Sequence, residues 1–427
     1  MIFGLPVFVV FGLISSFGMI SSASFSIFVV LGLVLLYFSV FVVHKLLVSK
    51  ITKLSQTLLF PSLFVIADFA SSKLNPYGSW TVLAYSQYQN KELLQFLSVF
   101  GIFGISFLVV WFASVFVLLL NFQFNFKILP KTWLIYPILF CAVLFFGGLR
   151  LNSKGDTNYV QIASISVPDN QKSSILLEKL FVQSEKLAKN SANKIIFWAE
   201  SNGITNESEL PQYISKSKQI AKDNQVYFFP TFLIIRQNQP RINKIMGFDP
   251  KGDQILDYLK YKPIPGESVV KGENLPQVIV AKIDNKTFRL ATAICFDNDF
   301  PEVINQMETD ILLQPSRDWA AIDPKYTYNL SFRAIENGFS TVKQTGFGLS
   351  QAVDYHGNVL SRTDFDSDLG GTNTMISKVP IKKVWTVYCL VKDSFVIFCL
   401  GVIIFFIWEN SSPNFLKTNK RIKQDFN

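Results

Sequence analysis

Three residues in the middle of the chain, Glu200, Lys260 and Cys295, carry side chains that could together perform covalent acyl chemistry. A thiol must become a thiolate to act as a nucleophile, and a carboxylate within hydrogen-bonding reach can take its proton. A lysine ammonium can hold the thiolate and then stabilise the oxyanion of a tetrahedral intermediate. These residue types indicate thiol-dependent acyl chemistry, provided that the fold brings them together.

The sequence patterns place all three residues at or just beyond the end of a predicted strand. Catalytic groups on α/β scaffolds collect at such ends, because a rigid sheet holds the loops there. The elements that would position them are a strand over 193–201 that ends on Glu200, a hairpin over 244–261 that turns at 249–252, and a strand over 288–296 that ends on Cys295.

The remaining elements of the middle region alternate between strands and helices, which is typical of an α/β domain. No repeat and no glycine-rich phosphate loop is found there. The predicted elements are strands over 159–167, 226–235 and 309–316, and helices over 173–190 and 328–337.

Structural roles remain open for each residue taken alone: a cysteine at a strand end can be a small apolar filler, and a glutamate or lysine can cap a helix or face solvent. Histidine offers no alternative base, because His44 lies in a predicted cytoplasmic loop and His356 in a predicted turn. Neither a Cys–His dyad nor a histidine-based zinc site is indicated, so we expect no metal and no cofactor.

The two ends of the 427-residue chain are far more apolar than its middle, with 49% hydrophobic residues and 42 Phe overall. About 20 apolar residues are needed to span the hydrocarbon of a bilayer. The first segment lacks a basic region before it and a clear cleavage site, so we expect a retained helix. The predicted spans are 2–19, 25–43, 58–70, 94–120, 133–149 and 395–408.

Cations flank these spans on one side, which the positive-inside rule assigns to the cytoplasm. They lie in the loop 44–53, in the loop after the fourth span, and in the tail. The net charge of +9 is thereby largely explained, and no nucleic-acid partner is needed. The predicted domains are a transmembrane bundle over 1–151, an extracytoplasmic domain over 152–392, a transmembrane helix over 393–409 and a basic cytoplasmic tail over 410–427.

Three short motifs resemble, in chain order, the catalytic motifs of the nitrilase (carbon–nitrogen hydrolase) superfamily: "FWAES", "YLKYKPIPGE" and "ICFDNDFPE". The resemblance implies an α-β-β-α sandwich and a triad of Glu200 as base, Lys260 as oxyanion-stabilising cation and Cys295 as nucleophile. It also implies a supporting role for Glu267 and an oxyanion-hole contact from the backbone N–H of Phe296.

The membrane segment narrows this resemblance to one branch, the apolipoprotein N-acyltransferase family. Residues 61–115, "GGLRL" at 147–151 and "WTVYCLVKDSF" at 385–395 are similar to that family in the correct order. The chain departs from the family pattern in having Ala199 where the base motif usually has proline, and in shortened loops after Lys260 and Trp319. Asp297 and Glu302 match the frame of the cysteine motif, and we expect them to shape its turn.

This second resemblance implies an N-acyltransferase that moves a phospholipid acyl chain through a cysteine thioester onto the N-terminal amine of a diacylglyceryl-cysteine lipoprotein. It also implies a multi-pass protein of the bacterial inner membrane with its catalytic domain on the periplasmic side, and we expect a monomer. A membrane-anchored amidase, or a non-catalytic relative that kept the fold, remains an alternative. An apolar site mouth would favour transfer over hydrolysis, and its candidate substrate-lining residues are Trp198, Trp319 and Phe347.

Overall fold

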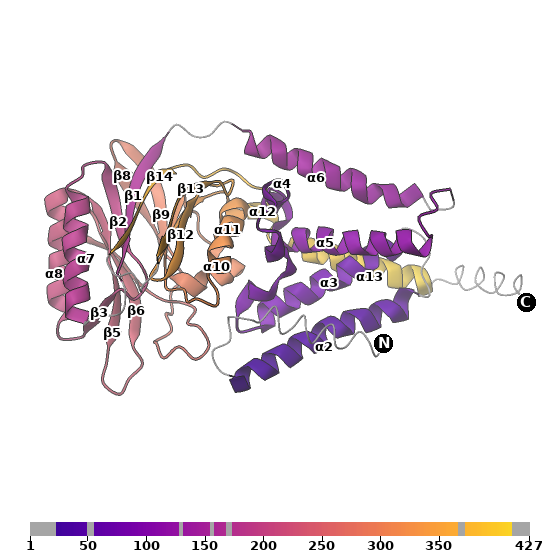
Figure 1. Ribbon diagram of the computed structural model, residues 1–427, viewed down its shortest axis with the longest axis horizontal. Helices are drawn as coiled ribbons and strands as arrows, with labels where there is room; N and C mark the ends of the chain where they lie inside the picture. The colour runs from indigo at the N-terminus through magenta and orange to yellow at the C-terminus, as the bar shows by residue number, and fades with distance from the viewer. Residues whose placement is uncertain are drawn as a thin grey trace, which may run out of the picture. The chain divides into compact units, whose positions relative to one another are not determined.

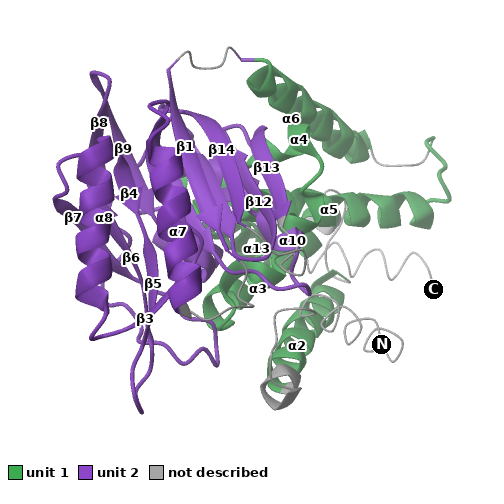
Figure 2. Ribbon diagram, turned by 60° about the vertical axis from the view of Figure 1, so that its left-hand side comes forward, with its two compact units in different colours: residues 1–152, 390–427 green, residues 153–389 purple. Residues whose placement is uncertain are grey.

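The chain falls into two compact units, which are coloured separately in Figure 2. The computed structural model describes residues 23–48, 55–127, 131–153, 158–167, 173–365 and 372–411. Unit 1 comprises residues 1–152 and 390–427, and unit 2 comprises residues 153–389.

Unit 1 is helical, and four of its described helices are long and apolar enough to cross a membrane. A fifth apolar helix is shorter, and Figure 1 labels all five. They are α2 (Ala23–Val48), α3 (Ser55–Leu74), α5 (Leu97–Asn121), α6 (Ile135–Leu151) and the shorter α13 (Ser394–Ser411).

Five of the six predicted spans correspond to these helices, and the predicted span 2–19 lies outside the described residues. The predicted span 58–70 ends before the helix does, because α3 continues to Leu74 through Ser71, Ser72 and Lys73. The helix can include these polar residues because the serine hydroxyls find partners: Ser72 donates to the backbone carbonyl of Phe69, and Ser71 bonds Thr81.

A buried aspartate ties three segments of unit 1 together. Asp68 on α3 accepts hydrogen bonds from the hydroxyls of Tyr37 on α2 and Ser106 on α5, and from the backbone N–H of Leu83. A polar group in an apolar bundle is costly unless it is satisfied. These three donors explain how Asp68 can be fully buried.

Unit 2 contains an eight-stranded and a six-stranded sheet with helices packed on them (Figure 1). The larger sheet has the order β14-β1-β2-β4-β6-β5-β3, with β7 paired to β6, and the smaller has the order β13-β12-β11-β10-β9-β8. The strands of the larger sheet are β1 (Tyr159–Ser166), β2 (Asn193–Trp198), β3 (Gly203–Asn206), β4 (Tyr227–Phe229), β5 (Thr231–Ile235), β6 (Ile242–Phe248), β7 (Gln254–Leu259) and β14 (Asn373–Pro380). Those of the smaller sheet are β8 (Val278–Ile283), β9 (Lys286–Thr292), β10 (Ile311–Ser316), β11 (Ser340–Thr345), β12 (Gly348–Val353) and β13 (Val359–Phe365).

Helices α7 (Ser173–Ala188) and α8 (Leu210–Asn224) cover one face of the larger sheet (Figure 1). The apolar positions of α7 recur at helical spacing, so Leu177, Leu180 and Phe181 bury one stripe against β1 and β2. Helix α11 (Leu330–Asn337) contacts β11 and β12 of the smaller sheet. The predicted fold class, a helical bundle plus an α/β sandwich domain, is therefore confirmed.

The two sheets are joined by hydrogen bonds between buried polar side chains. Gln344 on β11 accepts from the hydroxyl of Ser164 and donates to that of Ser166, both on β1. The backbone N–H of Glu200 donates to the carbonyl of Ser316 at the end of β10. These bonds fix the end of β2 against the end of β10, where the predicted catalytic residues lie.

Three predicted strand boundaries were wrong. The segment 226–235 forms two strands, β4 and β5, because Pro230 between them cannot donate a ladder hydrogen bond. The strand that leads to Glu200 ends at Trp198, and the strand that leads to Cys295 ends at Thr292. Glu200 and Cys295 consequently sit on loops just beyond their strands.

Candidate active site

Glu200, Lys260 and Glu267 form a buried ionic cluster in unit 2. The Lys260 Nζ atom lies 2.8 Å from Glu200 Oε1 and 2.8 Å from Glu267 Oε2. The Lys260 side chain is 1% exposed and that of Glu200 is 4% exposed, whereas Glu267 is partly exposed at 21%. The structure thus brings together three residues that span 67 positions of the chain. The sequence motifs predicted that these residues share one site.

Asn243 on β6 holds the two carboxylates in place, and it was not among the predicted site residues. Its Nδ2 donates to Glu200 Oε1 at 2.8 Å and to Glu267 Oε1 at 3.5 Å. Its carbonyl accepts from the backbone N–H of Lys260, because β6 pairs with β7. Glu267 is fixed further by the backbone N–H of Ile264 at 3.0 Å.

The electrostatics of this cluster keep Lys260 charged. Burial alone lowers the pKa of a lysine, but the charges of Glu200, Cys295 and Glu267 raise the pKa of Lys260 well above its usual range. A permanent cation next to the thiol is the group that an oxyanion or a thiolate requires.

Cys295 occupies a strained turn directly after β9. Its φ of 45° lies in the left-handed region, which is costly for a residue with a side chain. It opens the short 3₁₀ segment Cys295–Asp299, and its carbonyl accepts from Tyr326 Oη at 2.9 Å and from Gln314 Nε2 at 3.3 Å. Two side-chain donors therefore hold the backbone in this conformation.

The thiol of Cys295 responds to the charges of the cluster. Burial and the nearby Glu200 carboxylate raise its pKa well above the usual value, while the Lys260 ammonium and a hydrogen bond with Ser316 lower it. The resting group is a neutral thiol beside a carboxylate and a cation. Such a thiol needs a base at the moment of attack, which is the role that the resemblance implies for Glu200.

Asp297 connects the cysteine turn to the lysine loop. Its carboxylate accepts from Tyr258 Oη at 2.8 Å, from the backbone N–H of Lys262 at 2.7 Å and from that of Ile294 at 2.9 Å. Tyr258 and Lys262 flank Lys260 in sequence, so one buried side chain sets the spacing of the two loops. The expectation that Asp297 shapes the turn agrees with these contacts.

The aromatic residues expected to line the substrate path occupy different positions. Trp198 is fully buried in the core, where its ring packs against Phe181 and Phe228 and its Nε1 donates to Ser184. This corrects the expectation that Trp198 lines the site. Trp319 and Phe347 are partly exposed, whereas the Phe296 side chain is 1% exposed and contacts Phe300 edge to face.

A second buried ion pair, between β11 and the segment after β10, lies next to the site, and it was not among the predicted site residues. Lys343 Nζ on β11 lies 2.6 Å from Asp318 Oδ2 and 2.8 Å from Thr327 Oγ1. Asp318 Oδ1 accepts from the hydroxyl of Ser316. A lysine inside the strand "STVKQT" at 340–345 was the one available signal, since a buried strand excludes an unpaired cation.

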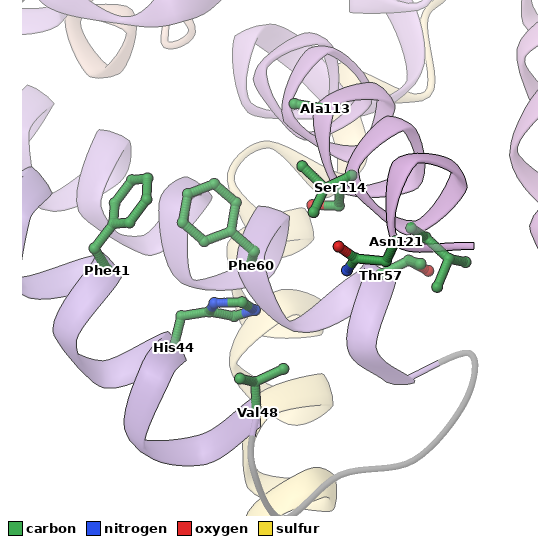
Figure 3. A pocket seen from close by; sticks show the side chains of 10 residues that line it. Phe41, His44, Val48, Thr57, Phe60, Ala113, Ser114 and Asn121 are labelled. Atoms are coloured by element: carbon green, nitrogen blue, oxygen red, sulfur yellow. The ribbon is translucent and has the colours of Figure 1, made fainter. Parts of the chain in front are cut away.

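A small cavity of about 100 Å³ opens beside the ionic cluster. Besides the cluster, it is lined by Ser201, Leu233, Arg241, Ile264 and Arg317. A larger and mostly apolar cavity of about 400 Å³ lies in unit 1, where Figure 3 shows Phe41, Phe60 and His44 around it. The larger cavity contains none of the candidate catalytic residues, so we place the chemistry at the smaller one.

Asp299, also in the cysteine turn, is predicted to make the stability of unit 2 depend on pH. Burial raises the pKa of its carboxyl from 3.8 to about 7. The unfolded state loses this proton near pH 4 and the folded state only near pH 7, so this group's contribution to stability is lost as the pH rises through that window. We expect Asp299→Asn to increase the free energy of unfolding at pH 8 by an amount on the order of a few kcal/mol, and by less at pH 5, so that the unfolding temperature rises more at pH 8. Thermal unfolding in detergent at the two pH values measures this, and an equal gain at both would contradict it; exposed Asp364→Asn is the control.

Among the residues that the structure describes, no group of three or more His, Cys, Asp or Glu side chains is arranged to hold a metal ion.

Fold and site together define a class of protein: a chain with apolar helices and an α/β sandwich domain that places a thiol beside a buried lysine and a carboxylate. Residues 1–115 match the family model described as "Apolipoprotein N-acyltransferase N-terminal domain". Among solved structures, an amidase from Nesterenkonia sp. is similar at a TM-score of 0.46 with 16% identity, covering 58% of this chain and 98% of the amidase.

Curated relatives point to the same family. The chain is 23% identical over 348 residues to the apolipoprotein N-acyltransferase of Geobacter metallireducens, covering 73% of this chain and 66% of that protein. The apolipoprotein N-acyltransferase of Rickettsia bellii is 22% identical, and the match covers 67% of this chain and 63% of that protein. That of Vibrio vulnificus is 25% identical, and the match covers 73% of this chain and 67% of that protein. The chain thus spans a little under two thirds of the length of the first two. The resemblance to the apolipoprotein N-acyltransferase family that the motifs predicted is confirmed, and with the apolar helices it indicates a bacterial membrane protein.

Proposed function

We propose that this protein is a membrane-embedded N-acyltransferase that uses Cys295 as nucleophile, Glu200 as general base and Lys260 as the oxyanion-stabilising cation. The observation that carries the proposal is the buried lysine held 2.8 Å from each of two carboxylates, next to a thiol on a strained turn. The similarity to enzymes named apolipoprotein N-acyltransferase supports an apolipoprotein amine as acceptor. From the resemblance of the motifs we infer a phospholipid as acyl donor and the amino terminus of a diacylglyceryl-cysteine lipoprotein as acceptor.

The first half-reaction transfers the acyl group to the enzyme. Glu200 takes the thiol proton of Cys295, and the thiolate attacks the ester carbonyl of the phospholipid. Lys260 and the backbone N–H of Phe296 stabilise the oxyanion. The ester C–O bond then breaks, the lysophospholipid leaves with the proton from Glu200, and a thioester remains on Cys295.

The second half-reaction transfers the acyl group to the acceptor. The α-amine of the lipoprotein attacks the thioester carbonyl, with Glu200 accepting a proton from the amine. The C–S bond breaks, an amide forms, and the thiol of Cys295 regains its proton. The thioester divides one difficult exchange into two easier steps, which is the general advantage of a covalent intermediate.

The proposed topology is multi-pass, with unit 2 on the periplasmic side of the inner membrane and the protein acting as a monomer. It is supported by the cations at the helix ends, such as Lys45 in the last turn of α2, which the positive-inside rule assigns to the cytoplasm. Both substrates are lipids held at a membrane surface, so an enzyme anchored there can meet them without extracting them from the bilayer.

Transfer and hydrolysis predict different products from the same thioester. Purified protein in detergent is mixed with a phospholipid carrying a labelled acyl chain and with a diacylglyceryl-cysteine peptide whose amine is free or acetylated. We expect mass spectrometry to find labelled amide on the free-amine peptide only. Labelled fatty acid formed at the same rate with both peptides would favour the amidase alternative, and the absence of any product or adduct would favour a non-catalytic relative.

A further inference from the structure

Two arginines from different sheets converge on the small cavity beside the ionic cluster. Arg241 directly precedes β6 of the larger sheet, and Arg317 directly follows β10 of the smaller one. Both line the same cavity of about 100 Å³ with Glu200, Lys260 and Glu267. Nothing in the proposed chemistry of the thiol, the base or the lysine requires either arginine.

The backbone holds both arginines near the reacting groups. The backbone N–H of Arg241 donates to the carbonyl of Ser268, and the backbone carbonyl of Arg241 accepts from the N–H of Val270. These bonds pair the backbone of Arg241 with the segment that follows Glu267. Arg317 lies between Ser316, whose carbonyl accepts from the N–H of Glu200, and the buried Asp318. The backbone of each arginine is therefore held within one or two residues of a group that contacts the cluster, and Arg241 Nε also donates to the carbonyl of Ser268 at 3.4 Å.

The charge and the size of the cavity both indicate a small anionic ligand. Its lining includes three cations and two carboxylates, which leaves one net positive charge at neutral pH. A volume of about 100 Å³ is far below the roughly 300 Å³ or more of pockets that enclose whole ligands. The small size and the positive charge together suit a compact anionic group such as a phosphate better than a whole lipid.

We propose that Arg241 and Arg317 form a phosphate-binding subsite that holds the phosphodiester of the phospholipid donor during acylation of Cys295. This inference rests on the proposed function, since it assigns the donor's headgroup to the cavity. Guanidinium groups bind phosphate oxygens in pairs through their planar fork, so two of them can fix a phosphodiester in one orientation. The subsite would also retain the lysophospholipid phosphate while the ester oxygen leaves.

The subsite predicts a preference for donors that contain phosphate. Thioester formation on Cys295 is measured with a phospholipid and with a neutral diacylglycerol carrying the same labelled acyl chains, both in the same detergent. We expect wild type to acylate at least about tenfold faster from the phospholipid, and Arg241→Gln with Arg317→Gln to lose that preference while keeping its rate on diacylglycerol. The paired lysine substitutions keep the charge without the fork, and should retain part of the preference.

Two outcomes would overturn the subsite: a wild type that uses both donors equally, or a double glutamine variant whose rates fall equally on both. Arg362→Gln is the matched control, because Arg362 is an exposed arginine on β13 that does not line the cavity. It should behave as wild type with both donors.

Binding of a soluble headgroup separates the subsite from the proposed function. We expect glycerophosphoethanolamine to show ³¹P line broadening with wild type and about tenfold weaker binding with the double glutamine variant. If this difference is found but no phospholipid forms a thioester, the subsite stands and the acyltransferase function fails. Equal binding by both proteins contradicts the subsite, and tight binding of inorganic phosphate without the glycerol phosphodiester assigns the cavity to free phosphate instead of a lipid headgroup.

Discussion

Replacing Cys295 with alanine is expected to abolish the acyl adduct that wild type forms with a labelled phospholipid. The thiolate sulfur is the atom that bonds to the acyl carbon, and no other group described around it can take that role. Loss of a catalytic nucleophile costs on the order of 10⁴-fold or more in rate. The fold should tolerate the change, because alanine keeps the Cβ atom and the turn is held through the Cys295 carbonyl by Tyr326 and Gln314.

The measurement is intact-protein mass spectrometry before and after hydroxylamine, which cleaves thioesters. Cys389→Ala is the matched control: Cys389 is the other cysteine of unit 2, it is partly exposed, and it bonds Thr386 away from the cluster. The control should retain a hydroxylamine-labile adduct at the wild-type level. An undiminished adduct on Cys295→Ala would show that another group carries the acyl chain, and the assignment of the nucleophile would then be wrong.

The sequence predicted the groups that do chemistry better than the groups that position them. Glu200, Lys260 and Cys295 could be found because each follows a segment with a strand pattern, and strand ends converge in an α/β domain. Asn243 and Tyr258 contact this site across 43 and 39 residues of chain, respectively. Their partners are set by which strands become neighbours, and no local pattern encodes that pairing.

Trp198 shows why proximity in sequence to a catalytic residue is a poor guide to the site. If β2 continued to Glu200, alternation would put Trp198 and Glu200 on the same face. The strand instead ends at Trp198, so the alternation does not extend to Glu200. The indole therefore faces α7 in the core while the carboxylate two residues later faces Lys260. Alternation along a strand therefore predicts the face of a side chain only as far as the strand itself extends.

The second large effect is expected for Lys260→Met, which removes the cation between two carboxylates. We expect unit 2 to lose about 3–5 kcal/mol of stability, because the nearly fully buried Glu200 would lose its main counterion. Thioester formation should fall by on the order of 10²–10³-fold, the range that follows the removal of one oxyanion-stabilising group. Thermal unfolding and the labelled-phospholipid assay measure the two effects on the same preparation.

The origin of the stability loss can be separated from the origin of the activity loss. Lys244→Met is the matched control, because Lys244 lies on the same hairpin and pairs at 2.6 Å with Asp257, a more exposed partner, so its loss should cost at most about 1 kcal/mol. Adding Glu200→Gln to Lys260→Met removes the buried carboxyl group that has lost its counterion, so the double variant should regain stability while remaining inactive. Recovery of activity together with stability would mean that Lys260 acts only by holding the fold. A Lys260→Met protein that is as stable as Lys244→Met would show that the buried pair is not formed as described.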